Sequence, residues 1–445
     1  MIKLGTNSIG TLYLGSTKIG KAYLGSNLVY ELNVAPEPTP DHACLTFRSS
    51  SSNTISLTCN GTAAPVLYYS TDGTTWTQWD YSAITFTKGH PFFLYGANTS
   101  GFNTGTDNYA QFVMAGDGNV SCSGSIATLI NGTNALTTIP SAYCFAHLFD
   151  ECEKLITCPT LPSTGLQNYC YWRMFFGTGI TEAPALPATT MKQYCYQTMF
   201  GNCANLTTPP TLSATSLASY CYRYMFQNCT SLTTAPALPA TTLQTYCYGY
   251  MFYGCTALVN PPTLGAKTMK NYCYYYMFSG CSSLVNAPAL PATTLASYCY
   301  QYMFQNCTSL VTAPTLSATT LATYCYQMMF YGCTNLANVQ ETLPATTLLS
   351  NCYNQMFRGC KKLTTAPVLP AVTLVTRCYY YMFYGCSALN YVKAMFTTTP
   401  SSSYTAYWLS GVSSTGTFVK NVDATWTTTG STGVPSAWTI QTASS

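Results

Sequence analysis

Charged side chains are scarce in this chain. Asp, Glu, Lys and Arg make up only 7% of its 445 residues, against roughly 25% in an ordinary soluble protein. The net charge is +4 and the sequence contains no basic run, so the electrostatic footprint of a nucleic-acid-binding protein is missing. We therefore expect a surface of Thr, Ser, Asn, Gln and Tyr, and no nucleic-acid partner.

Convergent titratable groups, which an enzyme needs, are also missing. The three histidines are His42, His90 and His147. The thirteen acidic residues are scattered, apart from one cluster at the start of the repeats described below: Asp150, Glu151 and Glu153, next to Lys154. A solvated cap explains this cluster better than an acid–base pair. The sequence thus predicts no enzymatic activity and no cofactor.

Long apolar runs are absent as well. No stretch approaches the roughly 20 residues that a membrane-spanning helix needs. The first residues, Met1 to Gly5, begin a glycine-punctuated pattern rather than a signal peptide. We therefore expect no membrane segment, and a protein made in the cytoplasm without an export signal.

What the chain does contain is a repeat of about 26 residues. Its first cysteine marks ten copies, at Cys144, Cys170, Cys195, Cys221, Cys247, Cys273, Cys299, Cys325, Cys352 and Cys378. A fixed period in this range is typical of a solenoid, in which each short unit buries its apolar face only by stacking on its neighbours. Function should therefore lie on the surface of the solenoid or at its ends.

The first part of each repeat unit, or rung, has a regular apolar pattern. In one rung the apolar residues are Cys299, Tyr300, Met303, Phe304 and Cys307. At 100° per residue they occupy one arc of a helix about 140° wide. This pattern predicts a short amphipathic helix or helical turn, which ends at the Gly or Asn before the second cysteine.

The second part of the rung, residues 310–321 in the same copy, alternates apolar and polar residues around Pro314. Such alternation favours a brief strand followed by a turn. Proline cannot donate a ladder hydrogen bond, so the strand should be only a few residues long. With strands about 4.8 Å apart, ten rungs would form a rod about 50 Å long.

Twenty-three cysteines allow three interpretations. The two cysteines of a rung would lie about 12 Å apart on a continuous helix, too far for a disulfide. Buried, reduced thiol ladders are favoured, because free Cys behaves as a small apolar residue. Disulfides between rungs are the alternative, and metal binding is the least favoured because His is scarce and no C-x-x-C occurs.

Tyrosine forms two rows along the repeats. One row precedes the first cysteine, at Tyr143, Tyr169, Tyr194, Tyr220, Tyr246, Tyr272, Tyr298 and Tyr324. The other follows it by three residues, at Tyr224, Tyr250, Tyr276, Tyr302 and Tyr381. On the expected helix both rows flank the core, so the rings either reach solvent and stack on sugars, or pack rung against rung. The candidate recognition surface is Tyr224, Tyr250, Tyr276 and Tyr302.

The run MF-x-G-C-x-x-L, followed by a proline-containing strand, resembles the BspA-type leucine-rich repeat of bacterial and phage surface proteins. The version LPATTLA-x-YCY is similar to that of gut Bacteroides and their phages. The resemblance covers roughly residues 141–389 and implies a mainly β solenoid with short helical turns. Two copies depart from the pattern. Thr178 replaces the second cysteine in one copy, and Asn351 replaces the tyrosine before the first cysteine in another.

A second repeat, ten residues long, fills residues 1–30. Its apolar positions are Leu4, Leu14 and Leu24, with Ile9, Ile19 and Val29 at a second phase. Units this small cannot bury a core alone. The segment resembles the N-terminal attachment segment of phage tail-fibre and head-fibre proteins, which implies contacts with other virion proteins and a homo-oligomer, most simply a trimer. A hairpin folded onto the next domain is the alternative.

Composition divides the chain into five parts. Residues 1–33 are the attachment segment, 34–40 a proline-rich linker, 41–133 a β-sandwich-like domain, 134–390 the solenoid and 391–445 a C-terminal cap. Short alternating runs between turn residues predict the sandwich. Within it, the stretch around Asp72 resembles an Asp-box hairpin, a structural turn. In the cap, whose ending resembles that of Bacteroides phage repeat proteins, Trp426 and Trp438 should cover the last rung.

These resemblances together imply a phage virion structural protein. It would be a fibre or receptor-binding appendage on the virion surface, whose rod contacts a glycan or protein of the host. A bacterial cell-surface adhesin of the BspA type is the alternative. A carbohydrate-active enzyme is less favoured, since no catalytic constellation is present.

Overall fold

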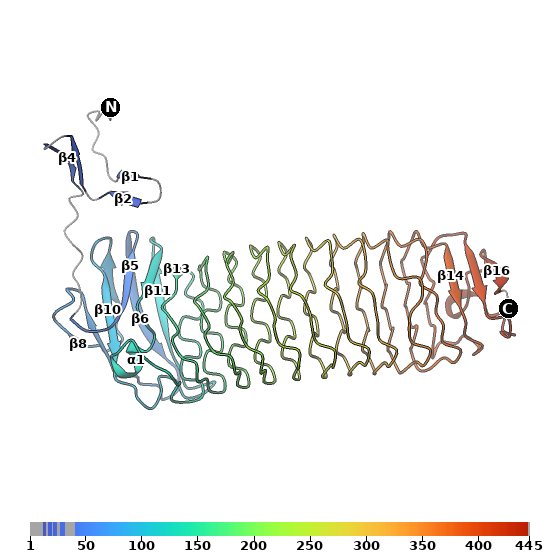
Figure 1. Ribbon diagram of the computed structural model, residues 1–445, viewed down its shortest axis with the longest axis horizontal. Helices are drawn as coiled ribbons and strands as arrows, with labels where there is room; N and C mark the ends of the chain where they lie inside the picture. Colours follow the sequence, from blue (N-terminus) through green and yellow to red (C-terminus); the bar gives the residue numbers. More distant parts are fainter. Residues whose placement is uncertain (1–11, 15–16, 20, 25–26, 32–40, 444–445) are drawn as a thin grey trace.

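The computed structural model describes residues 12–14, 17–19, 21–24, 27–31 and 41–443. From residue 41 onward the chain forms an elongated body, with a β domain at one end and a stack of rungs that leads to the C-terminal end (Figure 1). The N-terminal strands are β1 (Leu12–Leu14), β2 (Thr17–Ile19), β3 (Lys21–Leu24) and β4 (Asn27–Glu31). They pair as two antiparallel hairpins, β1 with β2 and β3 with β4.

The candidate attachment residues divide between strands and undescribed positions. Leu14, Ile19, Leu24 and Val29 lie in β1, β2, β3 and β4 respectively. Leu4 and Ile9 lie outside the described residues. The ten-residue period therefore coincides with the spacing of the two hairpins, and each ten-residue unit contributes two strands.

Two sheets form the domain that follows. The larger has the order β13-β12-β5-β10-β7-β8 and the smaller β11-β6-β9. Their strands are β5 (Leu45–Ser49), β6 (Ser52–Cys59), β7 (Leu67–Ser70), β8 (Thr77–Gln78), β9 (Ile84–Thr87), β10 (Phe92–Gly96), β11 (Ala110–Gly116), β12 (Val120–Ser123) and β13 (Leu155–Thr157). All pairs are antiparallel except β12 with β13. Phe47, Phe92 and Phe112, all fully buried, belong to one core.

Asp72 closes the turn between β7 and β8. Its Oδ1 accepts hydrogen bonds from the backbone N–H groups of Thr75 (2.7 Å) and Thr74 (2.9 Å) and from the Ser70 hydroxyl (2.9 Å). These bonds, the Thr75 N–H first, hold the pKa of Asp72 well below its usual range. The prediction of a structural turn is confirmed, and no catalytic role is needed to explain this carboxylate.

Strand β11 acts as the first layer of the stack. The Phe112 N–H donates to the Leu148 carbonyl (2.9 Å), as the corresponding Phe of each rung donates to the rung after it. The Phe112 ring lies 5.1 Å from the Phe149 ring, and the Cys152 thiol donates to the Phe112 carbonyl (3.0 Å). The β domain therefore closes the N-terminal end of the solenoid, and one hydrophobic core runs through both.

The amphipathic helix predicted for each rung does not form, and the alternative of a helical turn is met only by single turns closed by hydrogen bonds three residues back. The described residues contain one α-helix, α1 (Thr128–Asn131), and one 3₁₀ turn, η1 (Gly430–Thr432), both outside the repeats. Every fourth residue of the segment is instead left-handed: Tyr220, Tyr224 and Asn228 have φ of 63°, 60° and 56°. The segment is a chain of overlapping turns with a period of four residues.

Backbone hydrogen bonds explain why this conformation is stable. Alternate N–H groups donate to the next rung, such as Tyr224 to the Gly249 carbonyl (3.0 Å) and Phe226 to the Met251 carbonyl (2.9 Å). The intervening N–H groups bond three residues back within the rung. A left-handed non-Gly residue costs roughly 1–2 kcal/mol, and the ladder between rungs offsets this cost.

The proline-containing part of the rung makes few sheet hydrogen bonds. In the middle rungs it pairs only through isolated parallel bridges, for example Thr268 with Thr242 on one side and with Thr294 on the other. Longer strands occur only near the two ends, in β13 and β14 (Tyr391–Ala394). The expected strands are thus even shorter than the alternation of residues indicated.

The C-terminal end is closed by a small parallel sheet. Its strands are β14, β15 (Thr417–Lys420) and β16 (Thr439–Thr442). Trp408, Trp426 and Trp438 are buried there, and their indole N–H groups donate to backbone carbonyls. The Trp426 ring stacks 5.3 Å from Phe396, which in turn contacts the buried ring of Tyr379 in the last cysteine-marked rung.

Candidate functional site

The two outer tyrosine rows form one surface, here called the tyrosine face. In the row that precedes the first cysteine, neighbouring rings lie 4.3–5.0 Å apart with planes within 15° of each other. In the second row the four candidate residues also stack: the distance is 4.3 Å from Tyr224 to Tyr250, 4.8 Å from Tyr250 to Tyr276 and 4.1 Å from Tyr276 to Tyr302. The structure brings all four together in one continuous stack.

These stacked rings are half-buried. Each ring face in the middle of a row lies against the face of the next ring, so the faces are not open to a sugar. Packing of rung against rung, one of the two alternatives left open by the sequence, is therefore what occurs. A ligand can instead contact the edges of the rings, where one phenolic hydroxyl follows another at the spacing of the rungs.

The hydroxyls of Tyr250 and Tyr276 remain protonated over the whole physiological range. Burial raises the pKa of Tyr250 and Tyr276 well above its ordinary value, and neighbouring tyrosines of the row add to the shift. A neutral phenol both donates and accepts hydrogen bonds. The hydroxyl edge of the tyrosine face can thus bond to hydroxyl, amide or carboxylate groups.

The face is richest in aromatic rings around Tyr250. Tyr275 lies edge-on to Tyr250 (5.1 Å) and to Tyr276 (4.6 Å), and Tyr253 lies edge-on to Tyr250 (5.9 Å). Tyr253 is 38% exposed. Beyond Tyr302 the second row is interrupted, because Met328 stands at the equivalent position.

The second cysteine of each rung has a role that the sequence did not reveal. Its thiol donates to the Phe carbonyl of the preceding rung: Cys255 to Phe226 at 2.9 Å, and Cys281 to Phe252 at 3.1 Å. Burial raises the pKa of Cys255 from 9.0 to about 12, so the thiol keeps its proton. All 23 cysteines, which lie within residues 41–443, are free. The predicted burial of the thiol ladders is confirmed, and the two partly exposed cysteines, Cys59 and Cys158, lie outside the ladders.

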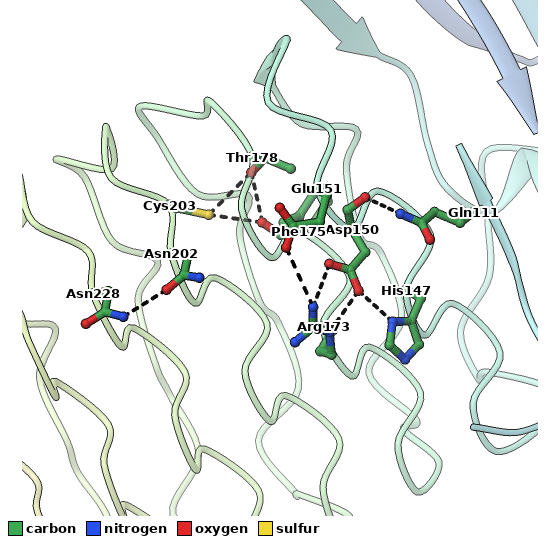
Figure 2. Close-up of polar contacts among 10 residues, drawn as sticks. All are labelled: Gln111, His147, Asp150, Glu151, Arg173, Phe175, Thr178, Asn202, Cys203 and Asn228. Carbon is green, nitrogen blue, oxygen red and sulfur yellow. Dashed lines mark hydrogen bonds and ion pairs between the residues drawn. The ribbon is translucent and has the colours of Figure 1, made fainter. Parts of the chain in front are cut away.

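Thr178 shows what happens where this cysteine is replaced. Its hydroxyl donates to the carbonyl of Phe175 in its own rung (2.9 Å) and lies 3.3 Å from the Cys203 thiol (Figure 2). The Cys203 thiol donates to the same carbonyl (3.0 Å). The stack therefore continues, while the Phe149 carbonyl receives no side-chain donor from the next rung.

The repeats also match a known protein family. Residues 130–259, 196–329 and 301–412 match the family described as BspA type leucine rich repeat region (6 copies). These ranges together cover more than half of the chain. The chain belongs to the BspA-type leucine-rich repeat family.

A crystal structure of a leucine-rich repeat protein from Bacteroides ovatus ATCC 8483 is similar to this BspA-type protein. It shares 17% sequence identity over 72% of this chain and 87% of that chain, with a TM-score of 0.41. No curated protein sequence matches the chain.

The start of the BspA-type solenoid holds the strongest polar cluster (Figure 2). Arg173 donates from Nε to Asp150 Oδ2 (2.8 Å) and from Nη2 to Asp150 Oδ1 (3.0 Å). His147 Nδ1 lies 2.6 Å from Asp150 Oδ2. Asp150 is only 5% exposed, so the prediction of a solvated cap is wrong for this residue, although Glu151 and Glu153 are exposed.

This cluster joins the β domain to the first rungs. Gln111 of β11 donates to the Asp150 carbonyl (2.5 Å), and the Tyr109 ring stacks 4.3 Å from His147. Both Asp150 oxygens are held by Arg173. The contacts of His147 among the described residues are with Asp150, Tyr109 and Trp172. The cluster is therefore a structural joint of the BspA-type rod.

Two further absences apply to the described part of the chain. No group of three or more metal-ligating side chains is close enough to hold an ion. None of its helices has the length and apolar character to cross a membrane.

Proposed function

We propose that this BspA-type protein is a structural component of a phage virion. It is a fibre or receptor-binding appendage with neither catalytic activity nor a cofactor, made in the host cytoplasm and displayed on the virion surface. Residues 1–33 attach it to other virion proteins. The β-sandwich-like residues 41–133 close the N-terminal end of the rod, which ten rungs form. The rod contacts a glycan or protein of the host surface.

The observation that carries this proposal is the edge of the tyrosine face. Four hydroxyls in register along Tyr224, Tyr250, Tyr276 and Tyr302 can bond to several groups of one extended ligand at once. Between residues 179 and 389 the carboxylates are only Glu182 and Glu341, so a polar, nearly acid-free surface is available. A glycan chain, which is extended and rich in hydroxyls, matches both features.

Two quadruple variants test this surface. Replacing the four tyrosines by Phe keeps the ring stack but removes every hydroxyl of the edge. We expect the Phe variant to melt close to the parent and to bind host cells at least about tenfold more weakly, since each lost hydrogen bond is worth about 0.5–1.5 kcal/mol. Binding of labelled protein to host cells and thermal melting measure the two effects.

The matching Ala variant separates recognition from packing. It removes the stacked rings themselves, so we expect lower thermal stability as well as lost binding. Parent-like cell binding by the folded Phe variant would contradict recognition through the hydroxyl edge. Parent protein that does not bind host cells would contradict the proposed function itself.

The N-terminal segment carries a separate prediction about assembly. Its ten-residue units are too small to bury a core alone, so we expect full-length protein to form an oligomer, most simply a trimer, or to bind a virion partner. A chain that starts at Asp41 should be a monomer. Light scattering of both chains measures the mass, and two monomers with no partner on the segment in the particle would contradict the prediction.

A bacterial cell-surface adhesin is the second candidate function, because membership of the BspA-type family is equally compatible with it. The rod and its tyrosine face would serve the same purpose there. The genes beside this one separate the candidates: capsid and tail genes favour the virion protein, and an export or anchoring system favours the adhesin.

A further inference from the structure

Cations outnumber carboxylates along the rungs. Residues 179–389 contain five lysines and three arginines but only two glutamates, a balance of +6. Two of the arginines, Arg223 and Arg358, are packed into the tyrosine face rather than extended into solvent. Both are half-buried, and neither forms an ion pair with a carboxylate among residues 41–443.

Arg223 lies in a nest of four tyrosine rings. Its guanidinium carbon is 4.6 Å from the ring centre of Tyr224, 4.9 Å from Tyr246, 5.6 Å from Tyr220 and 5.7 Å from Tyr250. These rings belong to two successive rungs and to both tyrosine rows. Cation–π attraction to several rings fixes the position of the guanidinium without neutralising its charge.

The sequence of the next two rungs makes room for this nest. Gly249 occupies the position that Arg223 has one rung earlier, so no side chain there separates Arg223 from the following rung. Tyr275 occupies it one rung later and packs edge-on against Tyr246 (5.9 Å) and Tyr250 (5.1 Å). The guanidinium therefore lies over the Gly249 rung, between aromatic rings.

The hydrogen bonds of Arg223 are incomplete. Its Nη2 donates to the Tyr224 hydroxyl at 3.3 Å, and its Nε is buried without a partner. A guanidinium has five N–H donors in a fixed fork. The buried Nε is out of reach of solvent and one Nη2 donor serves Tyr224, so the Nη1 donors and the second Nη2 donor are left for water or a ligand. An uncompensated, oriented guanidinium beside phenolic hydroxyls is the arrangement that binds a carboxylate through two parallel hydrogen bonds.

Arg173 provides the internal contrast. Its guanidinium also lies over an aromatic ring, 3.7 Å from the centre of Phe176. Its charge, however, is compensated by Asp150 through two hydrogen bonds. The same packing thus occurs with a built-in carboxylate at the end of the rod and without one in the middle.

We propose that the Arg223 nest binds a carboxylate of an acidic sugar in the host glycan. The nest supplies the guanidinium, and the hydroxyls of Tyr220, Tyr224, Tyr246 and Tyr250 bond to the sugar around it. Arg358 also packs against tyrosine rings, 4.8 Å from Tyr384 and 5.3 Å from Tyr381, but its Nη1 donates to Gln355 Oε1 (2.7 Å), so it is not a second nest of this kind. This inference rests on the proposed function and adds the chemical class of the ligand.

Titration of the full chain with an oligogalacturonate tests the inference. We expect this acidic oligosaccharide to bind at about 0.15 M salt, where long-range attraction is screened, and its fully methyl-esterified form not to bind. Arg223→Gln should weaken binding at least tenfold, and Arg223→Lys, which keeps the charge but not the fork, should weaken it less. Lys270→Gln removes an exposed charge outside the nest and should bind as the parent does.

Several results would overturn the inference. They are no binding of oligogalacturonate by the parent, equal binding of its methyl ester, parent-like binding by folded Arg223→Gln, or oligoglutamate binding as tight as that of the sugar. Host-cell binding measured in parallel keeps the two proposals apart. If Arg223→Gln binds cells normally while the Phe variant does not, the proposal of an acidic-sugar site is wrong and recognition through the tyrosine face is supported. If the parent binds no cells, the proposed function itself is wrong.

Discussion

Above about pH 9, this protein is expected to lose stability steeply and to unfold well before its thiols ionise in the folded state. Burial raises the pKa of Cys255 and Cys333 from 9.0 to about 12, and that of most other core thiols in the same direction. In the unfolded chain these groups release protons from about pH 9 upward, while the folded chain retains them. Their contribution to stability is therefore fully present below pH 9 and is lost as the pH rises toward 12.

The number of such groups makes the effect large. Each buried thiol contributes about 1.4 kcal/mol per pH unit once the unfolded chain ionises, and the ladders hold two thiols in most rungs. The measurement is the free energy of unfolding in urea from pH 7 to pH 11, under reductant and without oxygen. A stability that stays constant over this range would contradict the prediction.

A matched variant identifies the groups responsible. Replacing Cys281 and Cys307 by Ser keeps a hydrogen-bond donor for the carbonyls of Phe252 and Phe278 but removes two ionisable thiols. We expect this variant to be less stable at pH 7, because a hydroxyl fills the apolar site less well, and to lose stability with a shallower pH slope. An unchanged slope would show that other groups, such as the buried tyrosines, dominate.

Asp150→Asn is expected to lower the free energy of unfolding by about 3 kcal/mol. The substitution leaves Arg173 without its bidentate partner and weakens the contact with His147, whose side chain is only 9% exposed. Because these residues join β11 to the first two rungs, the loss should be local. Hydrogen exchange should accelerate in residues 103–178 and remain unchanged in the middle rungs.

Glu151→Gln is the control for this joint. Glu151 also faces Arg173, at 3.9 Å, but its side chain is 58% exposed, so its removal should change stability by less than about 0.5 kcal/mol. If Asp150→Asn has as small an effect as the control, the buried ion pair does not hold the joint together.

The sequence predicts which residues are buried in the rungs but not the backbone conformation of these residues, and both results have one physical reason. Apolar residues such as Cys299, Tyr300, Met303, Phe304 and Cys307 fit one face of a helix over nine residues, but they fit a period of four equally well. The Gly or Asn before the second cysteine is expected to stop a helix. In the structure it is the third left-handed position of a series that tyrosine begins, as at Tyr298, Tyr302 and Asn306.

The joint at Asp150 could not be predicted because its partners are distant in sequence. Arg173 lies 23 residues away and Gln111 lies 39 residues away, so nothing local distinguishes a buried carboxylate from the exposed Glu151 beside it. One signal was present: His147 and Arg173 occupy, in successive rungs, the position that tyrosine holds farther along. A polar pair in register with an aromatic row indicates that the row has been adapted there for another contact.

The replacement of the second cysteine at Thr178 also bears on the mechanics of the rod. Each rung is tied to the next by axial N–H bonds and, in the regular part, by one thiol that reaches back to a Phe carbonyl. Tension applied at the free end is therefore shared by equivalent interfaces over most of the length. The interface at Phe149 lacks its thiol but is crossed by the two hydrogen bonds from Arg173 to Asp150, so tension at this end of the rod is carried by an ion pair in place of a thiol.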